Sequence, residues 1–486
     1  MNRDQNSASV GVFGIGLAAY WPQFPGLQER LQGYQAQVEA RLAGMGVDVV
    51  SAGLVDTAPA AVAAGDLFAR ARVDLIICYV GTYATSSQVL PAVQRGKAPV
   101  LVLNLQPAAA LDYPNTDTAE WLAHCSACCV PEIANAFARS RIAFNVVSGL
   151  LGPAEGHAGR YFDRAWNEIA EWVAAVRVKR AISAARIGFL GHTYPGMLDM
   201  YSDFTMHHAQ LGAHVEVLEM DDLHKRVAQA TDAEIAAKIG EIRRVFEIAA
   251  PGRDKISQPV TEEGLRWAAQ VAVGLDRLVA DFDLDGLTYY YRGLDGNPNE
   301  ELGASVIVGN SLLTARGIPA AGEGDLKTCV AMLMMDRLGA GGSYTEFYAM
   351  DFVEDFILMG HDGPGHIAIS DGRPVLRGLG LYHGKRGYGI SVEFNVKTGP
   401  VTILGLTQTA DGRLKMVAAE GESIPGPRLE IGNTNSRLKF GLDPAEFMER
   451  WSEQGPTHHC ALGVGHQLGK IRKLSRLMGI ELAVIG

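Results

Sequence analysis

The stretch "DLIICYVG" (residues 74–81) is a short apolar run that begins at an aspartate and ends at a glycine. It follows the amphipathic stretch "AAVAAGDLFARARV" (60–73) and precedes a second apolar run, "APVLVLNLQ" (98–106). Short buried strands that alternate with helices are typical of βαβ units around a parallel sheet. Because the alternation already begins at "VGVFGIG" (10–16), the first part of the chain is predicted to be a doubly wound α/β domain.

The same pattern starts again at "RIGFLGHT" (186–193) and continues through helical stretches near 231–249 and 260–280. It reaches a further strand within "LDGLTYYYRG" (284–293). A strand, a helix and another strand in that order predict a second α/β domain with a parallel sheet.

The pattern changes after about residue 340. Segments such as "HIAISDGRPVLRG" (366–378) alternate apolar and polar residues between DG and TG turns, which is typical of antiparallel strands. The closing stretch "LGKIRKLSRLMGIELAVIG" predicts a helix that ends at a glycine, then a last strand. We therefore expect two doubly wound α/β domains and an antiparallel β-barrel-like domain, with the boundaries 1–183, 184–338 and 339–486.

Composition and charge narrow the class of ligand. The 486 residues are 48% hydrophobic and 20% charged, with a formal net charge of −11. Since no lysine and arginine block exceeds "GKIRKLSR" (469–476), the basic surface expected of a nucleic-acid-binding protein is missing. The first ten residues hold no apolar leader and no run of 18 apolar residues occurs. These features predict a cytoplasmic protein that acts on a small polar molecule and spans no membrane.

The turn after the first strand, "GIGLAA" (14–19), superficially resembles a dinucleotide-binding loop. It lacks the third glycine, and "YWPQFPG" (20–26) would break the helix that such a motif must open. Loops at the carboxyl ends of parallel strands nevertheless often line a ligand cleft. Tyr20, Trp21 and Gln23 are therefore candidate ligand contacts.

The six cysteines are too few and too irregularly spaced for a disulfide framework. Three of them, Cys125, Cys128 and Cys129, form the cluster "HCSACC" (124–129), but no second CxxC pair accompanies it to complete a zinc site. We interpret them as reduced cysteines of a loop or of the core.

Four polar residues interrupt apolar surroundings further along the chain. Glu323 lies in "PAAGEGDLKT", Glu346 and His361 lie in "SYTEFYAMDFVEDFILMGHDGPGH", and His459 ends a pair of histidines. Singly, each has an ordinary structural explanation, such as a favourable helix N-terminus for Glu323. Together, two carboxylates and two imidazoles suit manganese, cobalt or a similar divalent ion. Spacing alone leaves open whether the four converge.

Four motifs occur in an order that resembles the L-arabinose isomerases, within the arabinose and fucose isomerase superfamily. They are "GEGDLKT", "GGSYTEFYAMDF", "LMGH" and "GPTHHC". The resemblance covers the three-domain plan and is specific over residues 286–361 and 455–460. It implies a catalytic Mn²⁺, or another divalent metal such as Co²⁺ or Mg²⁺, held by Glu323, Glu346, His361 and His459.

The resemblance further implies an aldose–ketose isomerase that works through a metal-stabilised enediol, with Glu323 and Glu346 as catalytic acid and base. Family members are homo-oligomers, trimers or hexamers, in which the N-terminal domain completes a neighbour's site. Lys327 is interpreted either as a charge partner for an active-site carboxylate or as an ordinary helix residue, and we favour the second. Candidate sugar contacts are Trp21, Gln23, His192, Tyr290 and His458, with Met197, Tyr289 and Tyr291 near them.

The chain departs from the family in two places. Leu326 replaces the tryptophan of the first motif, and "CSACCVPE" (125–132) stands where the family carries a substrate-facing histidine. These differences leave open whether the aldose is L-arabinose, D-galactose or a related sugar. Two alternative functions are a non-catalytic sugar-binding protein and a metal-dependent hydrolase with the same ligands.

Overall fold

The computed structural model describes residues 7–251, 254–291, 297–380 and 389–486. By its contacts the chain divides into two compact units, residues 1–180 and 181–486, and α6 (Gly159–Ser183) carries it from one into the other. Among the described helices, none combines the length and the apolar character that a membrane span requires.

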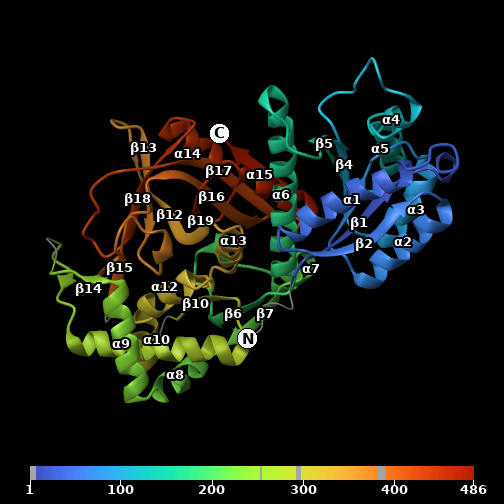
Figure 1. Ribbon diagram of the computed structural model, residues 1–486. Helices are drawn as coiled ribbons and strands as arrows, with labels where there is room; N and C mark the ends of the chain where they lie inside the picture. Colours follow the sequence, from blue (N-terminus) through green and yellow to red (C-terminus); the bar gives the residue numbers. More distant parts are fainter. Residues whose placement is uncertain (1–6, 252–253, 292–296, 381–388) are drawn as a thin grey trace. The chain divides into compact units, whose positions relative to one another are not determined.

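The first unit contains a five-stranded sheet in the order β2-β1-β3-β4-β5, in which all neighbouring strands are parallel. From β1 the chain moves first to β2 on one side and then to β3 on the other, as in a doubly wound sheet. Figure 1 shows this sheet with helices packed around it. The strands are β1 (Ser9–Ile15), β2 (Asp48–Val55), β3 (Leu75–Tyr79), β4 (Val100–Gln106) and β5 (Phe144–Leu150), and the other helices are α1 (Leu27–Ala43), α2 (Ala58–Ala71), α3 (Ser86–Gly96), α4 (Thr118–Leu122) and α5 (Cys129–Arg139).

Local sequence explains this arrangement. Every residue of β3 is buried, as expected of a central strand covered on both faces. After β1 the chain makes a 3₁₀ turn at Ala18–Tyr20, and α1 begins only at Leu27, beyond Pro22 and Pro25. The predicted break in the helix is therefore confirmed.

The second unit begins with a four-stranded parallel sheet in the order β11-β10-β6-β7. Figure 1 shows α8, α9 and α10 side by side in this unit, and α10 packs against both of the others. The strand predicted near 284–293 is β10, whose last predicted residues, 292 and 293, lie outside the described part. The elements are β6 (Arg186–Gly191), β7 (His214–Leu218), β10 (Gly286–Tyr290), β11 (Ala320–Ala321), α7 (Phe204–Leu211), α8 (Met220–Ala228), α9 (Asp232–Val245), α10 (Glu262–Phe282), α11 (Pro298–Ala304), α12 (Ile307–Ala315) and α13 (Leu326–Arg337).

The rest of the second unit is built around a closed antiparallel barrel of six strands, in the order β16-β19-β12-β13-β18-β17. Pairing of β16 with β17 closes it, and β20 adds to β17 in parallel. Helix α13 is buried and packs against β12, β16 and β19, as well as β10 of the parallel sheet. The barrel strands are β12 (Gly341–Asp351), β13 (Phe356–His361), β16 (Gly399–Gln408), β17 (Leu414–Ile424), β18 (Thr434–Phe440) and β19 (His459–Val464). Helix α14 (Pro444–Ser452) lies between β18 and β19, and α15 (Leu468–Met478) and β20 (Glu481–Ile485) follow β19.

A small sheet completes this unit, with β14 paired to β15, β8 and β9. Its strands are β8 (Glu247–Ile248), β9 (Ser257–Gln258), β14 (Val375–Leu379) and β15 (Ile390–Glu393). The predicted fold class, parallel α/β sheets followed by an antiparallel barrel, is confirmed. The division of the second unit into two domains at residue 338 stays a prediction.

Candidate active site

The loop between β11 and α13 holds Glu323 in an unusual backbone conformation. Glu323 has φ 61° and Gly324 has φ 71°, so two successive residues are left-handed. Gly324 N–H donates to Tyr289 O at 3.0 Å, and a Cβ at Gly324 would lie 2.5 Å from His192 O. A left-handed residue other than glycine is uncommon and often marks a functional position. The loop thus fixes Glu323 at the end of β10.

The barrel brings the other motifs to the same place. Glu346 on β12 pairs with Gly360 on β13 and with His459 on β19. His361 follows Gly360 and ends β13. Because β12 lies between these two strands, residues more than 100 positions apart in the sequence become neighbours.

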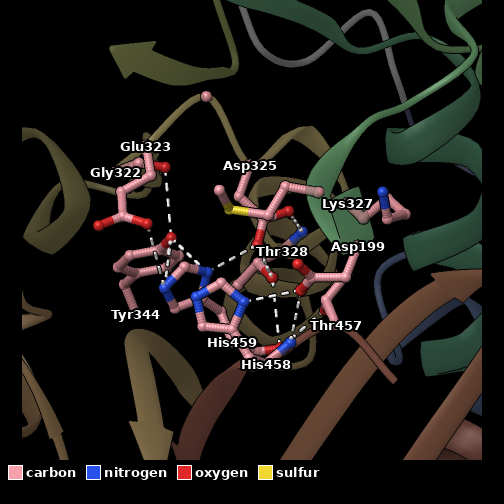
Figure 2. A network of polar contacts seen from close by, with 12 residues as sticks. Asp199, Gly322, Glu323, Asp325, Lys327, Thr328, Tyr344, Thr457, His458 and His459 are labelled. Carbon is pink, nitrogen blue, oxygen red and sulfur yellow. Dashed lines mark hydrogen bonds and ion pairs between the residues drawn. The ribbon is translucent and has the colours of Figure 1, made fainter. Parts of the chain in front are cut away.

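His459 is the centre of a buried polar network (Figure 2). Its Nε2 lies 3.2 Å from His361 Nε2 and 3.8 Å from Glu323 Oε2. The Tyr344 hydroxyl lies 2.7 Å from His459 Nδ1 and donates to Gly322 O at 3.3 Å. Burial raises the pKa of Tyr344 well above its usual value, so this hydroxyl stays protonated.

Asp325 orients His459 from the first residue before α13. Its carboxylate accepts from Thr328 N at 3.0 Å, from Thr328 Oγ1 at 2.7 Å and from His459 Nδ1 at 3.0 Å. Burial opposes ionisation of Asp325, but the hydrogen bond from His459 still holds the pKa of this carboxyl below its usual value. Burial also lowers the pKa of His459. A neutral His459 that donates from Nδ1 keeps the lone pair of Nε2 available to a ligand.

His458 has a carboxylate partner of its own, Asp199, in the 3₁₀ turn Leu198–Met200. Asp199 Oδ2 accepts from His458 Nδ1 at 2.7 Å and from His458 N at 3.0 Å (Figure 2). Burial favours the neutral imidazole, yet the bond to Asp199 raises the pKa of His458 overall. The Nε2 atom of His458 is again the nitrogen left for another partner.

These residues include a set that can hold a metal ion. In the described part of the chain, ligand atoms of Glu323, His458 and His459 all lie within 4.8 Å of one another. One carboxylate and two imidazoles held by second carboxylates are a donor set typical of divalent metal sites, so the residues present fit such an ion. The group does not include Glu346 or His361.

His361 and Glu346 have different surroundings. Gly363 N–H donates to His361 Nδ1 at 2.9 Å, and His361 Nε2 lies 3.2 Å from His459 Nε2. Glu346 is half-buried, and burial raises the pKa of its carboxyl to about 7. A carboxyl that titrates near neutrality is suited to accept and return a proton.

The structure also locates the predicted sugar contacts. His192 is exposed after β6, and its ring lies 5.2 Å from that of Tyr290, which is buried at the end of β10. Met197 is half-buried in the same loop as His192. Tyr289 and Tyr291, which neighbour Tyr290, are half-buried and pack against the core of the second unit.

Trp21 and Gln23 belong to the first unit. There Trp21 Nε1 donates to Asp56 at 2.7 Å, and Gln23 Nε2 donates to Ala19 O at 2.6 Å. Tyr20, beside them, packs against the apolar cluster of α1. Their proposed contact with sugar stays a prediction.

Lys327 is not an ordinary helix residue, contrary to the prediction. Its side chain is buried, and Nζ donates to Tyr201 O at 3.0 Å and to Ser202 Oγ at 2.9 Å. It therefore holds the segment after Asp199 against α13. The periodicity of α13 did not predict this burial because residues 326–335 are buried on every side of the helix.

Sequence reasoning missed Asp199, Asp325 and Tyr344. Two local signals were present: Asp325 stands three residues before Thr328 at a helix start, a common capping arrangement, and Tyr344 shares a strand face with Glu346. Asp199 gave no local signal, because it is 259 positions from its partner His458.

Comparison with known proteins identifies similar sequences. The chain matches the model of the L-arabinose isomerase central domain over residues 202–341 and that of the L-arabinose isomerase C-terminal domain over residues 341–481. Together the two matches cover more than half of the chain.

Individual relatives give the same picture. An L-arabinose isomerase of Clavibacter sepedonicus is 26% identical over 66% of this chain and 63% of its own length. A sulfoquinovose isomerase of Alkalicoccus urumqiensis is 25% identical over 63% of this chain and 66% of its own length. An L-arabinose isomerase of Salmonella enteritidis PT4 is 24% identical over 72% of this chain and 68% of its own length. The chain thus spans slightly less than two thirds of the first two relatives.

Proposed function

Because the chain belongs to the L-arabinose isomerase family, we propose that it is a metal-dependent aldose–ketose isomerase. One observation carries the proposal: Glu323, His458 and His459 come from two distant motifs, and their ligand atoms lie within 4.8 Å of one another. The substrate is a small sugar, and the candidates are L-arabinose, D-galactose, a related aldose, or sulfoquinovose, which the name of one relative adds.

The metal ligands that we propose are Glu323, Glu346, His361 and His459, with His458 as a further candidate. The geometry supports Glu323 and His459 most directly, since both belong to the compact group. Mn²⁺ is the first candidate, and Co²⁺ or Mg²⁺ would suit the same oxygen and nitrogen donors. A bound divalent ion would polarise the sugar carbonyl and stabilise negative charge on its oxygen.

The chain's own residues would move the proton between the two adjacent carbons. Isomerisation requires a base that takes a proton from one carbon and returns it to the next. Glu346 suits this role, because its half-buried carboxyl group lies on β12 directly opposite His459 of β19. Glu323, fixed by its left-handed backbone, is the second acid and base. His458, held by Asp199, would bind a sugar hydroxyl or support the metal.

We further propose that His192 and Tyr290 contact the sugar, and that the protein works as a homo-oligomer, a trimer or hexamer in the cytoplasm. In such an assembly Trp21 and Gln23 would belong to the site of a neighbouring subunit. The position of His192 in the loop after β6, where parallel sheets usually bind ligands, supports the first part.

An assay for ketose formation tests the function. Metal-stripped protein is incubated with each candidate sugar, with and without Mn²⁺, and the products are separated by chromatography. We expect one aldose to yield its ketose only with metal present. If no sugar is converted, the proposal is wrong; sugar binding without turnover would indicate a binding protein.

Two variants on the same hairpin test the role of Glu346. Glu346→Gln should lower kcat by about 10²- to 10⁴-fold, the usual contribution of a general base. Glu354→Gln changes an exposed glutamate in the turn between β12 and β13 and should leave kcat unchanged. Equal activity of the two variants would remove Glu346 from the mechanism.

A further inference from the structure

The first unit has a cavity that is lined in part by the cysteine cluster at 124–129. Its volume is about 360 Å³, and it lies beyond the carboxyl end of β4, between the segment 106–113 and the start of α5. Gln106, Tyr113, Trp121 and His124 contribute to its wall. Two thiols, those of Cys125 and Cys128, complete the wall.

The two thiols are adjacent to each other. Cys125 Sγ and Cys128 Sγ are 2.8 Å apart, and Cys128 Sγ also lies 3.4 Å from Cys125 O. The residues between them form the turn that leads into α5, with Cys128 as the residue that caps this helix of 11 residues. A C-x-x-C pair at a helix start brings both sulfurs within reach of a disulfide without unfolding the helix.

The two cysteines differ in accessibility. Cys128 is exposed, whereas Cys125 is buried. Burial raises the pKa of the Cys125 thiol to about 12, and the neighbouring Cys128 adds to this effect. The exposed thiol is therefore the one that an external reagent meets first, and the buried thiol is shielded from direct attack.

Cys129 is excluded from this pair although it is the next residue. It is fully buried, and its Sγ donates to Ala84 O at 2.9 Å, on the side of the core. It belongs to the apolar cluster with Val89, Ile133 and Phe137. Cys129 is thus a packing residue, as the sequence analysis predicted for the cluster, and it provides a matched control.

We propose that Cys125 and Cys128 form a reversible disulfide by exchange with a low-molecular-weight disulfide. The Cys128 thiolate attacks one sulfur of the reagent, expels one thiol and carries the mixed disulfide. The Cys125 thiolate then attacks Cys128 Sγ and expels the second thiol. Both cysteine protons end on the two released thiols. The cysteine pair loses two electrons and the small disulfide gains them.

The disulfide would change one wall of the cavity. Two thiol groups that can donate hydrogen bonds are replaced by a sulfur bridge without donors, and the turn from Cys125 to Cys128 is fixed. Oxidation is therefore a way to alter what the cavity binds.

The experiment exposes the full-length protein to mixtures of reduced and oxidised glutathione with an increasing oxidised share. After acid quenching and alkylation of free thiols, peptide mass spectrometry gives the state of each cysteine. In wild type we expect the peptide with Cys125 and Cys128 to lose two hydrogens and both alkylation sites, and dithiothreitol to reverse this. Cys129→Ser, which keeps the pair and a donor for Ala84 O, should behave as wild type.

The two single variants test the order of attack. In Cys125→Ser, Cys128 should retain one glutathione, because no second thiol resolves the mixed disulfide. In Cys128→Ser, Cys125 should be modified at least tenfold more slowly than Cys128 is in wild type. Wild-type thiols that stay alkylatable at every ratio, or a stable glutathione adduct on wild-type Cys128, would overturn the proposal. These wild-type readings need no variant to fold.

Discussion

Asp325 acts on the candidate site through its neighbours. It is fully buried, and its two carboxylate oxygens bind Thr328 and His459. The bond to His459 fixes which ring nitrogen keeps its lone pair, and such partners of metal-binding histidines strongly affect metal affinity. Charge on Asp325 matters here, because it makes His459 a better electron donor.

We expect Asp325→Asn to weaken Mn²⁺ binding by about 10- to 100-fold. Asparagine still caps the helix as well as aspartate does, so the loss reports on the charge toward His459. Isothermal titration of metal-stripped protein measures the affinity. Asp443→Asn, at the start of α14, changes an exposed cap of the same kind and should leave the affinity unchanged. Equal affinities in the two variants would show that Asp325 only caps α13.

The turn between β11 and α13 depends on one glycine. Gly324 has φ 71°, and a Cβ there would lie 2.5 Å from His192 O and 2.6 Å from Thr193 Cα. Gly339 has a similar φ of 79°, but a Cβ there would meet nothing within 4 Å. The two positions therefore share a left-handed backbone, which would strain any residue with a Cβ, and they differ in what that Cβ would contact.

We expect Gly339→Ala to lower the free energy of unfolding by about 1–2 kcal/mol, the usual penalty for a left-handed residue with a side chain. Gly324→Ala should lower it further and also weaken Mn²⁺ binding, because the added methyl group displaces the loop that carries Glu323. Urea unfolding and metal titration measure the two effects. If both variants lose the same stability and bind metal equally, the close approach to His192 does not position Glu323.

Helix α7 contains a buried histidine that should make stability depend on pH. His207 is fully buried, and neither ring nitrogen has a hydrogen-bond partner among the described residues. Burial, assisted by the charge of Lys327, lowers the pKa of His207 to about 4. In the unfolded chain the pKa of histidine is about 6.5. The contribution to stability is thus fully present above pH 6.5 and is lost as the pH falls toward 4.

At pH 4.5 the need to keep His207 neutral in the folded state should lower the free energy of unfolding by about 3 kcal/mol relative to neutral pH. We expect His207→Met to lose less stability than wild type between pH 7.5 and 4.5, as measured by urea unfolding of metal-free protein. His208, the exposed neighbour of His207, supplies the control. The variant His208→Gln should lose as much stability over this pH range as wild type does. Identical losses in all three proteins would mean that His207 is protonated in the folded state.

The sequence predicted elements better than their pairing. Alternation of apolar runs identified most strands of both parallel sheets, though not β5 or β11. Glycine and proline marked the helix ends, because these are local signals. The contact between Tyr344 and His459 joins residues 115 positions apart, and no local pattern specifies such a register. The motifs nevertheless indicated Glu323 and His459 as neighbours. Only the barrel pairing explains why Glu346 lies opposite His459.

At the scale of the whole molecule, the chain separates into two units, and each contains one of the two candidate sites. The candidate metal group lies entirely in the second unit, and the thiol pair lies in the first. By its contacts the chain divides after residue 180, within the long helix α6, and the domain boundary at residue 183 stays a prediction. Composition changed again near residue 340, where the parallel strands give way to the barrel.

Metal binding should therefore stabilise one part of the molecule selectively. A ligand that binds only the folded state at 100 times its Kd adds about 2.7 kcal/mol to stability. We expect hydrogen exchange with Mn²⁺ at this concentration to slow in peptides around Glu323 and His459, while peptides from the sheet of the first unit exchange as before. In Glu323→Gln the protection should be lost, because an amide oxygen is a weaker ligand than a carboxylate. Protection that persists in this variant, or that spreads equally over β1 to β5, would place the metal elsewhere, since an ion held between β11, α13 and β19 can restrain only the segments that it joins.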